Sequence, residues 1–361
     1  MSHVSVEPWG VVEELVLASG SGPERLRKTI LDVGLERTVD VIINEFLLRF
    51  NPPRFDGRAN LQLEVTVGGD RVGWVLTAQD GKVRFESGWA DSADAHIGFD
   101  AVDLVASMFG PFERARHASR SVTWSREFMN RPAPTDMTEL QGCLEPWQRL
   151  SPIVHAVLSA FTAQPVNLGE LSVRFGSDKW AHFHWYTQHY ERHFAPLRND
   201  PVRVLEIGVG GYDNPEIGGG SLRMWQLFFP RGLVYGLDLF EKPHTYGPRT
   251  RTIQGDQSDP EFLNELGCEL GPFDIIIDDG SHVNDHVKTS FRSLFPHVRP
   301  GGLYIIEDLQ TAYWPGYGGN DHDLHDENTS LTMLKDLVDG LNHQDLPHPD
   351  GRAFPATPTR T

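Results

Sequence analysis

Residues 202–211 constrain the fold of this chain more than any other segment. They read V-R-V-L-E-I-G-V-G-G, a short run of aliphatic and β-branched residues that ends in Gly208, Gly210 and Gly211. Such a run is typical of a buried parallel strand, and the glycines allow a tight turn and the close approach of a ligand. Ser221 is predicted to cap the helix that follows, whose N-terminus favours an anionic group. The segment therefore predicts the start of a Rossmann-like nucleotide-binding unit.

The glycine spacing differs from that of dinucleotide-binding proteins. The third glycine of a G-x-G-x-x-G fingerprint would fall at position 213, which is occupied by Asp213. Glu206 lies two residues before Gly208, and its carboxylate favours a cationic or amine-bearing ligand. The segment thus predicts a nucleoside site of another kind.

Length, charge and cysteine content exclude several classes of protein. The 361 residues are enough for two domains, each with its own core. No run of about eighteen apolar residues occurs, and the N-terminus lacks the pattern of a secretory signal. The two cysteines agree with a reducing compartment, so we predict a cytoplasmic protein with no membrane partner. The net charge of −18 argues against nucleic acid and is compatible with a cationic ligand or a metal ion.

The N-terminal part of the chain, residues 1–165, is predicted to form an auxiliary domain. A helical pattern extends to about residue 50, and Pro52 and Pro53 end it. Alternating apolar and polar residues then predict an antiparallel α+β unit, with a hairpin turn at Asp80 and Gly81. Its expected strands lie near residues 61–67, 72–76, 83–85 and 96–99, followed by a helix at 101–108.

The C-terminal part, residues 166–361, has a different organisation. Short buried strands alternate with helical patterns, which is typical of an α/β protein with a doubly wound parallel sheet. The expected strands cover residues 202–207, 233–237, 251–254, 273–277 and 303–306. Ligands of such sheets bind at the carboxyl ends of the strands, so the chemistry-bearing residues should be sought there.

Polar residues follow the second and third of these strands. Asp238 ends the second strand, where an acidic side chain accepts the ribose hydroxyls of a nucleoside. Asp256 and Gln257 follow the third strand, at the position where nucleoside-binding folds often contact adenine. These three residues are therefore candidates for binding the nucleoside.

Acidic residues and a histidine follow the fourth and fifth strands. Asp279 and His282 belong to the sequence D-D-G-S-H, and Glu307 and Asp308 follow G-G-L-Y-I-I. Asp279, Glu307 and Asp308 form a set of oxygen ligands that suits a divalent cation such as Mg²⁺. His282 could be a metal ligand, a general base or a helix cap, and we favour the base because an imidazole can accept a proton at cellular pH.

Two further groups of polar residues have less specific interpretations. On a helix, His182, His189 and His193 would share a face and His184 would lie apart. We expect these histidines at the surface or an interface, because no carboxylate or cysteine at ligand spacing supports a zinc site. The acidic, glycine-rich loop at residues 318–326 is either a solvated loop or a lid over the metal site.

Taken together, the glycine loop, Asp238, D-D-G-S-H and the E-D pair resemble the class I S-adenosylmethionine-dependent methyltransferases. The sequence F-G-S-D-K-W-A-H-F-H-W-Y before them narrows the resemblance to the sugar O-methyltransferases of macrolide tailoring, the mycinamicin VI 2''-O-methyltransferase and demethylmacrocin O-methyltransferase group. The resemblance implies methylation of a deoxysugar hydroxyl on a polyketide glycoside, with S-adenosyl-L-methionine and Mg²⁺ as cofactors. It also implies a homo-oligomer, a dimer or tetramer.

The resemblance assigns roles to particular residues. His282 would take the proton, and Asp279, Glu307 and Asp308 would hold the metal. The methyl donor's site would be lined by Glu206, Gly208, Gly210, Ser221, Asp238, Asp256, Gln257 and Asp279.

One feature departs from the class I pattern. After residue 306 a helical pattern follows, and no alternating run predicts the final β-hairpin of that sheet, so we expect the hairpin to be missing. Two alternative functions follow from the residues: a methyltransferase acting on a non-sugar diol such as a catechol, or a homologue that binds the donor without turnover.

Overall fold

The computed structural model describes residues 9–53, 57–79, 82–112, 120–125, 137–181, 184–243 and 246–341. The chain forms two compact units. The first contains Met1–Pro201 with the short segments Arg223–Gly232 and Gly247–Arg249, and the second contains Val202–Leu222, Leu233–Tyr246 and Thr250–Thr361. Within the described part of the chain, no helix is both long enough and apolar enough to cross a membrane.

Helices of the first unit begin and end where local signals place them. They are α1 (Trp9–Ser19), α2 (Pro23–Val33), α3 (Leu35–Arg49) and α4 (Ala101–Phe109). Proline stands at the first position of α2, and Gly34, with φ 95°, separates α2 from α3. The carboxylate of Asp100 accepts hydrogen bonds from the backbone N–H groups of Val102 and Asp103, so it caps α4.

The sheet of the first unit is mixed, which corrects the antiparallel prediction. Its strands are β1 (Arg58–Val67), β2 (Asp70–Gln79), β3 (Lys82–Ser87), β4 (Ala95–Asp100) and β5 (Arg120–Trp124), in the order β3-β2-β1-β4-β5. Strands β1 and β4 pair in parallel. The reason is that Asp94 exchanges hydrogen bonds with Asn60, which places the start of β4 beside the start of β1. The sequence did not reveal β5, and the turn expected at Asp80 and Gly81 lies outside the described residues.

The histidine-rich segment is not one continuous helix. The order of elements after β5 is α7 (Met137–Ala160), α8 (Leu168–Phe175), β6 (Trp180–Ala181), β7 (His184–Trp185), α9 (Thr187–Phe194) and η1 (Ala195–Leu197). His184 lies in β7, where its ring stacks on Tyr186 at 4.7 Å between centroids. His189 and His193 lie on α9, and His182 is outside the described residues.

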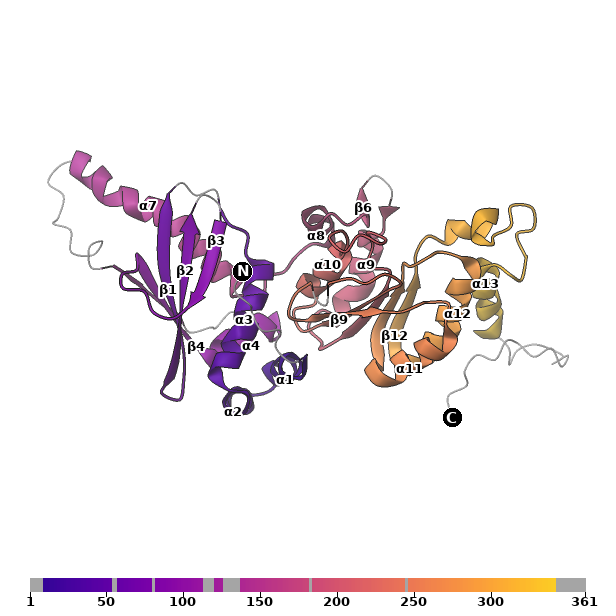
Figure 1. The fold of residues 1–361 in the computed structure, drawn as a ribbon, viewed down its shortest axis with the longest axis horizontal. Helices are drawn as coiled ribbons and strands as arrows, with labels where there is room; N and C mark the ends of the chain where they lie inside the picture. The colour runs from indigo at the N-terminus through magenta and orange to yellow at the C-terminus, as the bar shows by residue number, and fades with distance from the viewer. Residues whose placement is uncertain are drawn as a thin grey trace. The chain divides into compact units, whose positions relative to one another are not determined.

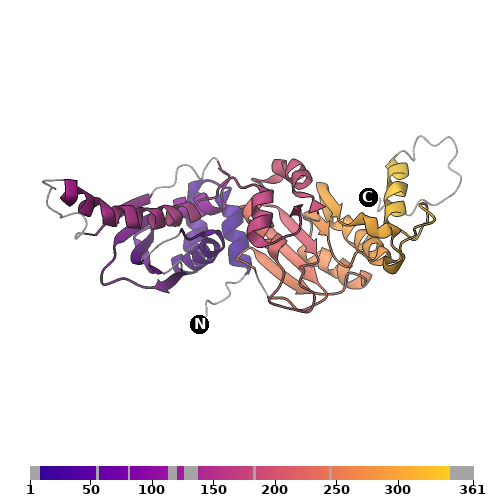
Figure 2. The same cartoon turned by 90° about the horizontal axis from the view of Figure 1, so that it is seen from above.

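The second unit contains the predicted parallel sheet. Its strands are β8 (Arg203–Ile207), β9 (Leu233–Asp238), β10 (Thr250–Gln254), β11 (Phe273–Asp278) and β12 (Val298–Ile306). Their order is β10-β9-β8-β11-β12, and every pair is parallel (Figures 1 and 2). The order reverses between β8 and β11, which makes their carboxyl ends the switch point where ligands of such sheets bind.

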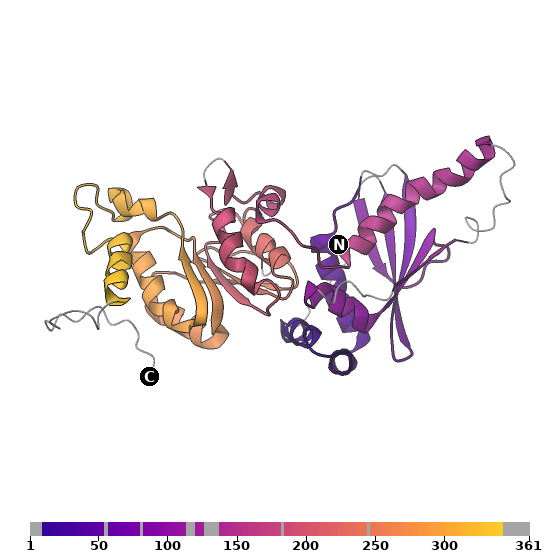
Figure 3. The same cartoon turned by 180° about the vertical axis from the view of Figure 1, so that it is seen from behind.

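Helices and short 3-10 turns connect these strands. They are α10 (Gly220–Phe228), α11 (Pro260–Leu270), α12 (Asn284–Leu294), η2 (Phe295–His297), η3 (Leu309–Tyr313), η4 (Pro315–Tyr317) and α13 (Ser330–Leu341). Helices α11 and α12 lie side by side (Figure 3). Between residues 307 and 341 no further strand joins the sheet, as the sequence predicts, and residues 342–361 lie outside the description.

Candidate active site

The glycine loop after β8 packs tightly against the end of β11. Gly208, Gly210 and Gly211 have φ values of 92°, 81° and 80°, which favour glycine. A Cβ atom on Gly208 would lie 2.1 Å from the carbonyl oxygen of Asp279. Only glycine fits at this position, and the loop therefore lies directly beside the D-D-G-S-H segment.

Asp238 fixes the glycine loop from the neighbouring strand. One carboxylate oxygen accepts a hydrogen bond from the backbone N–H of Val209 at 2.9 Å, and the other accepts one from Phe240 at 2.9 Å. A carboxylate has about four acceptor positions, so these bonds leave capacity for a ligand. The contact to ribose stays a prediction, and the position at the end of β9 agrees with it.

Ser221 does not cap its helix, which corrects the sequence prediction. Helix α10 begins at Gly220, and the Ser221 hydroxyl donates to the Glu206 carboxylate at 2.7 Å. Hydrogen bonds to charged acceptors are stronger than those to neutral ones, and this explains why the hydroxyl bonds to the strand instead of its own helix end. Glu206 is fully buried at the end of β8, beside the loop.

Asp256 and Gln257 are neighbours in the sequence, but the first is exposed and the second is buried. Asp256 is exposed, and hydrogen bonds from the backbone N–H and hydroxyl of Ser258 lower the pKa of its carboxyl. Gln257 is 7% exposed; its amide donates to Asp278 at 3.2 Å and accepts from the Ser281 backbone N–H at 2.6 Å. The Gln257 side chain therefore braces the D-D-G-S-H segment, and its contact with adenine stays a prediction.

Asp278 is a buried polar centre that the sequence analysis missed. Burial raises the pKa of its carboxyl to about 6, although hydrogen bonds from Ser290, Gln257 and Gly280 oppose the shift. Burial and the nearby Asp278 carboxyl also raise the pKa of the Tyr304 hydroxyl well above its ordinary value. A strand that is buried on both faces has no alternation of apolar and polar residues. The sequence pattern therefore could not show that Asp278 is buried whereas Asp279 is partly exposed.

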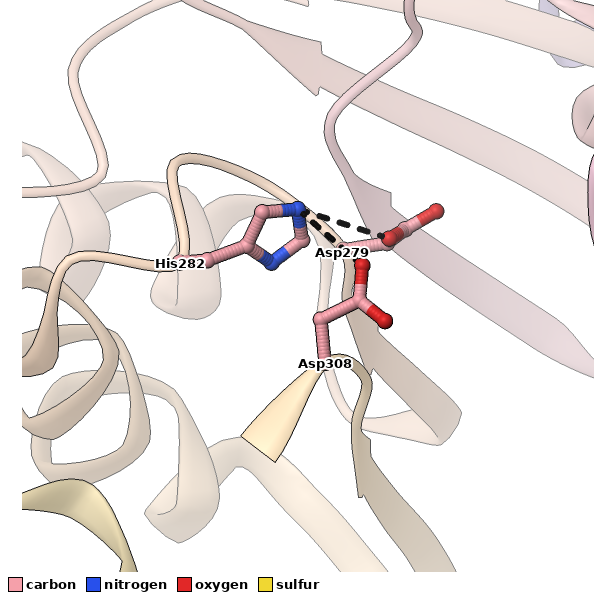
Figure 4. Close-up of side chains that lie close together, drawn as sticks. All are labelled: Asp279, His282 and Asp308. Atoms are coloured by element: carbon pink, nitrogen blue, oxygen red, sulfur yellow. Dashed lines mark ion pairs between the residues drawn. The ribbon is translucent and has the colours of Figure 1, made fainter. Parts of the chain in front are cut away.

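Three of the predicted residues meet at the ends of β11 and β12. The Nε2 atom of His282 lies 4.0 Å from an Asp279 oxygen and 3.6 Å from an Asp308 oxygen (Figure 4). Their side chains are 22%, 22% and 16% exposed for His282, Asp279 and Asp308. Ligand atoms of all three lie within 4.8 Å of one another, close enough to share one metal ion.

This cluster is built on a strained backbone. His282 and Asp308 have φ values of 58° and 53°, and among the described non-glycine residues only Tyr212 joins them with a positive φ, at 49°. Tyr212 follows the glycine loop, so all three lie at the carboxyl ends of β8, β11 and β12. Such conformations cost about 1–3 kcal/mol each and concentrate at functional sites.

Glu307 is not part of the three-residue cluster. It is 5% exposed, and its backbone N–H donates to the carbonyl oxygen of Asp278 at 3.0 Å. Asp279 and Asp308 offer the oxygen ligands that Mg²⁺ prefers, so the donor set fits this ion, and the role of His282 as a base stays a prediction. A role for Glu307 as a third ligand stays a prediction.

Comparison with known protein families finds a match in the N-terminal part. The family of MycE methyltransferase N-terminal domains matches residues 12–120. These residues run from within α1 to the start of β5 and include α2 to α4 and β1 to β4.

Curated proteins match nearly the whole chain. Demethylmacrocin O-methyltransferase from Streptomyces fradiae is 43% identical over 346 residues, which cover 95% of this chain and 85% of that protein. The 8-demethyl-8-(2-methoxy-alpha-L-rhamnosyl)-tetracenomycin-C 3'-O-methyltransferase from Streptomyces olivaceus is 40% identical over 354 residues, 98% of this chain and 90% of that protein.

A solved structure shares this fold over most of its length. The MycE methyltransferase from the mycinamycin biosynthetic pathway, in complex with Mg, SAH and mycinamycin VI, superposes with a TM-score of 0.83 at 40% identity. The match covers 96% of this chain and 88% of that one. Both the fold and the order of the two parts are therefore shared.

Proposed function

The chain belongs to the family of sugar O-methyltransferases from macrolide and tetracenomycin biosynthesis, and from this premise we propose its reaction. It transfers a methyl group from S-adenosyl-L-methionine to a hydroxyl of a deoxysugar on a macrolide or other polyketide glycoside. The observation that carries the proposal is the cluster of Asp279, His282 and Asp308 beside the glycine loop. The cluster offers a metal site and a base next to a nucleoside site.

The methyl donor binds at the carboxyl ends of β8, β9 and β10. Gly208 and Gly210 have no side chains, so the methyl donor can approach the loop backbone closely. The Glu206 carboxylate, which accepts from Ser221, gives this region a negative charge that suits the cationic methionine part of the donor. Asp238 takes the ribose hydroxyls with the acceptor positions that the loop leaves available. Asp256, whose carboxylate also accepts hydrogen bonds from Ser258, accepts from the adenine amine.

Asp279 and Asp308 hold Mg²⁺, with Glu307 as a further ligand. When bound, Mg²⁺ supplies Lewis acidity, which lowers the pKa of a coordinated sugar hydroxyl. Asp279 lies against the glycine loop, so the residue that holds the acceptor also lies next to the donor. This proximity fixes the reacting groups in one geometry.

His282 is the general base. Its Nε2 atom faces the two carboxylates, so a hydroxyl held there lies within reach of the ring (Figure 4). The hydroxyl proton moves to His282 as the oxygen attacks the methyl group, and the sulfonium leaves as a neutral thioether.

We also propose a homo-oligomer, a dimer or tetramer, in the cytoplasm. The assembly is what the resemblance to the macrolide sugar O-methyltransferases implies. Light scattering coupled to size exclusion measures the oligomer directly. A monomer at micromolar concentration would contradict it.

The reaction is tested by methyl transfer from S-adenosyl-L-methionine to a panel of demethylated macrolide and rhamnosylated polyketide glycosides, with Mg²⁺ and with EDTA. A product that forms only with Mg²⁺ is expected. Turnover with catechols but no glycoside would support the non-sugar diol alternative. Donor binding without any product would support the inactive homologue, and equal turnover in EDTA would contradict the metal's role.

A further inference from the structure

An exposed group of aromatic rings begins five residues after Asp308. Tyr313, Trp314 and Tyr317 are 40%, 48% and 36% exposed. The rings of Trp314 and Tyr317 lie 5.8 Å apart at an angle of 57°. This aromatic segment, residues 313–317, spans the end of η3 and η4, between β12 and α13 (Figure 1). Large exposed aromatic groups next to a reactive site are typical of ligand-binding surfaces.

The aromatic segment is fixed to the cluster by a continuous set of hydrogen bonds. The Asp308 carbonyl oxygen accepts from the Thr311 backbone N–H at 3.1 Å and from its hydroxyl at 3.0 Å. The Thr311 carbonyl accepts from the Trp314 N–H at 3.0 Å, and the Trp314 carbonyl accepts from Tyr317 at 2.9 Å. The rings are therefore presented by an ordered backbone that begins at a metal-site residue.

Asn284 ties the same segment to the loop that carries His282. It is 1% exposed, and its amide donates to the carbonyl oxygens of Thr311 at 3.2 Å and Tyr317 at 3.0 Å. Its side-chain oxygen accepts from the backbone N–H and the hydroxyl of Ser330 at 2.7 and 2.9 Å. Because all of these bonds belong to one buried side chain, Asn284 sets the aromatic segment relative to the base two positions before it.

We propose that the aromatic segment binds the apolar body of the glycoside acceptor, while the cluster binds the sugar hydroxyls. The assignment rests on the proposed function. Continuity decides the occupant: the rings begin five residues after Asp308 and are tied through Asn284 to the His282 loop. An amphiphilic glycoside has one polar end for the carboxylates and one apolar end for the rings. Trp314 contributes most, because it is the most exposed of the three.

The test replaces Trp314 by alanine and by phenylalanine. In Trp314→Ala we expect KM for an intact polyketide glycoside to rise about tenfold, which corresponds to about 1.4 kcal/mol. The KM for the corresponding methyl glycoside without the polyketide should stay within a factor of about two, as should kcat and the affinity for S-adenosylhomocysteine. Trp314→Phe should recover most of the loss, since it restores a ring.

The matched control is Phe295→Ala. Phe295 is 39% exposed and stacks on the buried Phe291 at 4.8 Å between centroids, so it is an exposed aromatic side chain in the same unit. It precedes β12 at the opposite end of the strand from Asp308 and should not affect either KM.

Binding of the intact glycoside by equilibrium dialysis, with S-adenosylhomocysteine present, separates this proposal from the proposed reaction. Weaker binding to Trp314→Ala supports the aromatic segment even when no methyl transfer is detected. Equal binding by wild type and Trp314→Ala overturns it. Equal loss for the intact and the truncated glycoside, or a change of oligomer without a change in KM, also overturns it.

Discussion

Carboxylates lie in opposite environments in two regions of the molecule. In the first unit, Glu45 on α3 is fully buried, and it accepts hydrogen bonds from Arg49 at 2.7 Å and from Arg249 at 2.8 and 3.0 Å. In the second unit, Asp279 and Asp308 remain partly exposed on loops, with His282 at 3.6 to 4.0 Å. The charge of Glu45 is compensated inside the protein, whereas the cluster is open to a ligand.

The difference separates a structural site from a functional one. The Arg249 guanidinium donates to Glu45 and also to the carbonyl oxygens of Gln226, Phe229 and Gly232, so that all its N–H groups are used. Because all donors of Arg249 are already bonded within the protein, none is available to a ligand. Loss of one partner of this buried pair would strongly destabilise the fold. At the cluster, by contrast, a strained backbone holds acidic groups near one another, and this arrangement favours binding of a cation.

The largest expected effect is on turnover, at the cluster. His282→Ala should lower kcat by about 10²–10⁴-fold, because a general base contributes that much. The free energy of unfolding and the affinity for S-adenosylhomocysteine should change little, since the His282 Nε2 atom lies 3.6 Å or more from the Asp279 and Asp308 oxygens and the residue is not part of the glycine loop. Steady-state kinetics, calorimetric titration and urea unfolding measure the three quantities.

His193→Ala is the control for this prediction. His193 is exposed on α9, and its removal should leave kcat unaltered. If His282→Ala retains full turnover, the base is another group. If His282→Ala unfolds more easily than the wild type, His282 also stabilises the fold, and this would contradict the proposed contrast between a structural and a functional site.

The next effect is on stability, at Glu45. Glu45→Ala leaves two buried arginines without their carboxylate, and loss of one partner of a buried ion pair typically costs about 3–5 kcal/mol. We expect the free energy of unfolding to fall by this amount, while the folded fraction keeps its kcat at low temperature. Glu86→Ala, at an exposed position on β3, should change the stability by less than about 0.5 kcal/mol. A similar small change for Glu45→Ala would contradict the structural role.

A smaller effect of the same kind is expected with pH. Burial alone would raise the pKa of Glu45, but Arg249 and Arg49 outweigh it and hold this pKa below the ordinary value. A lowered folded-state pKa means that the stabilisation is present above the ordinary carboxyl pKa, about 4.3, and is lost as the pH falls below it. In urea unfolding between about pH 5 and 3, the stability of wild type should therefore fall more steeply than that of Glu45→Gln, by up to about 1.4 kcal/mol per pH unit. Parallel curves would show that Glu45 titrates normally.

The same contrast explains how much the sequence could predict. Strands β8, β9 and β11 were found because each contains a short apolar run, and the site followed because carboxyl ends of such strands converge. The sequence analysis placed Asp279, His282 and Asp308 there without any knowledge of distances. Glu45 was read only as part of a helix, since its partner Arg249 lies 204 positions away and no local pattern links them.

Features that depend on tertiary contacts escaped the sequence analysis. The parallel pairing of β1 with β4 depends on the bonds between Asp94 and Asn60, and the bond of Ser221 to Glu206 overrides a local capping preference. Positive φ at His282 and Asp308 could not be assigned from the sequence either: Asp and His adopt it more often than most residue types, but still too seldom for the residue type alone to mark the position. The positive φ angles and the hydrogen bonds between residues distant in the sequence therefore could not be predicted from the sequence.

The smallest expected effect has the opposite sign from that at Glu45. Asp308→Gly removes a side chain from a residue with φ 53°, a conformation that glycine adopts freely and other residues adopt at a cost of about 1–2 kcal/mol. Part of this gain is offset by the greater freedom of glycine in the unfolded chain. Removal of one carboxylate also lowers the repulsion within the cluster. In EDTA, so that no metal stabilises the wild type, we expect urea unfolding to give a gain of about 0.5–1 kcal/mol with loss of turnover. A variant less stable than wild type would mean that Asp308 serves the fold as Glu45 does, and the distinction between the two regions would then be lost.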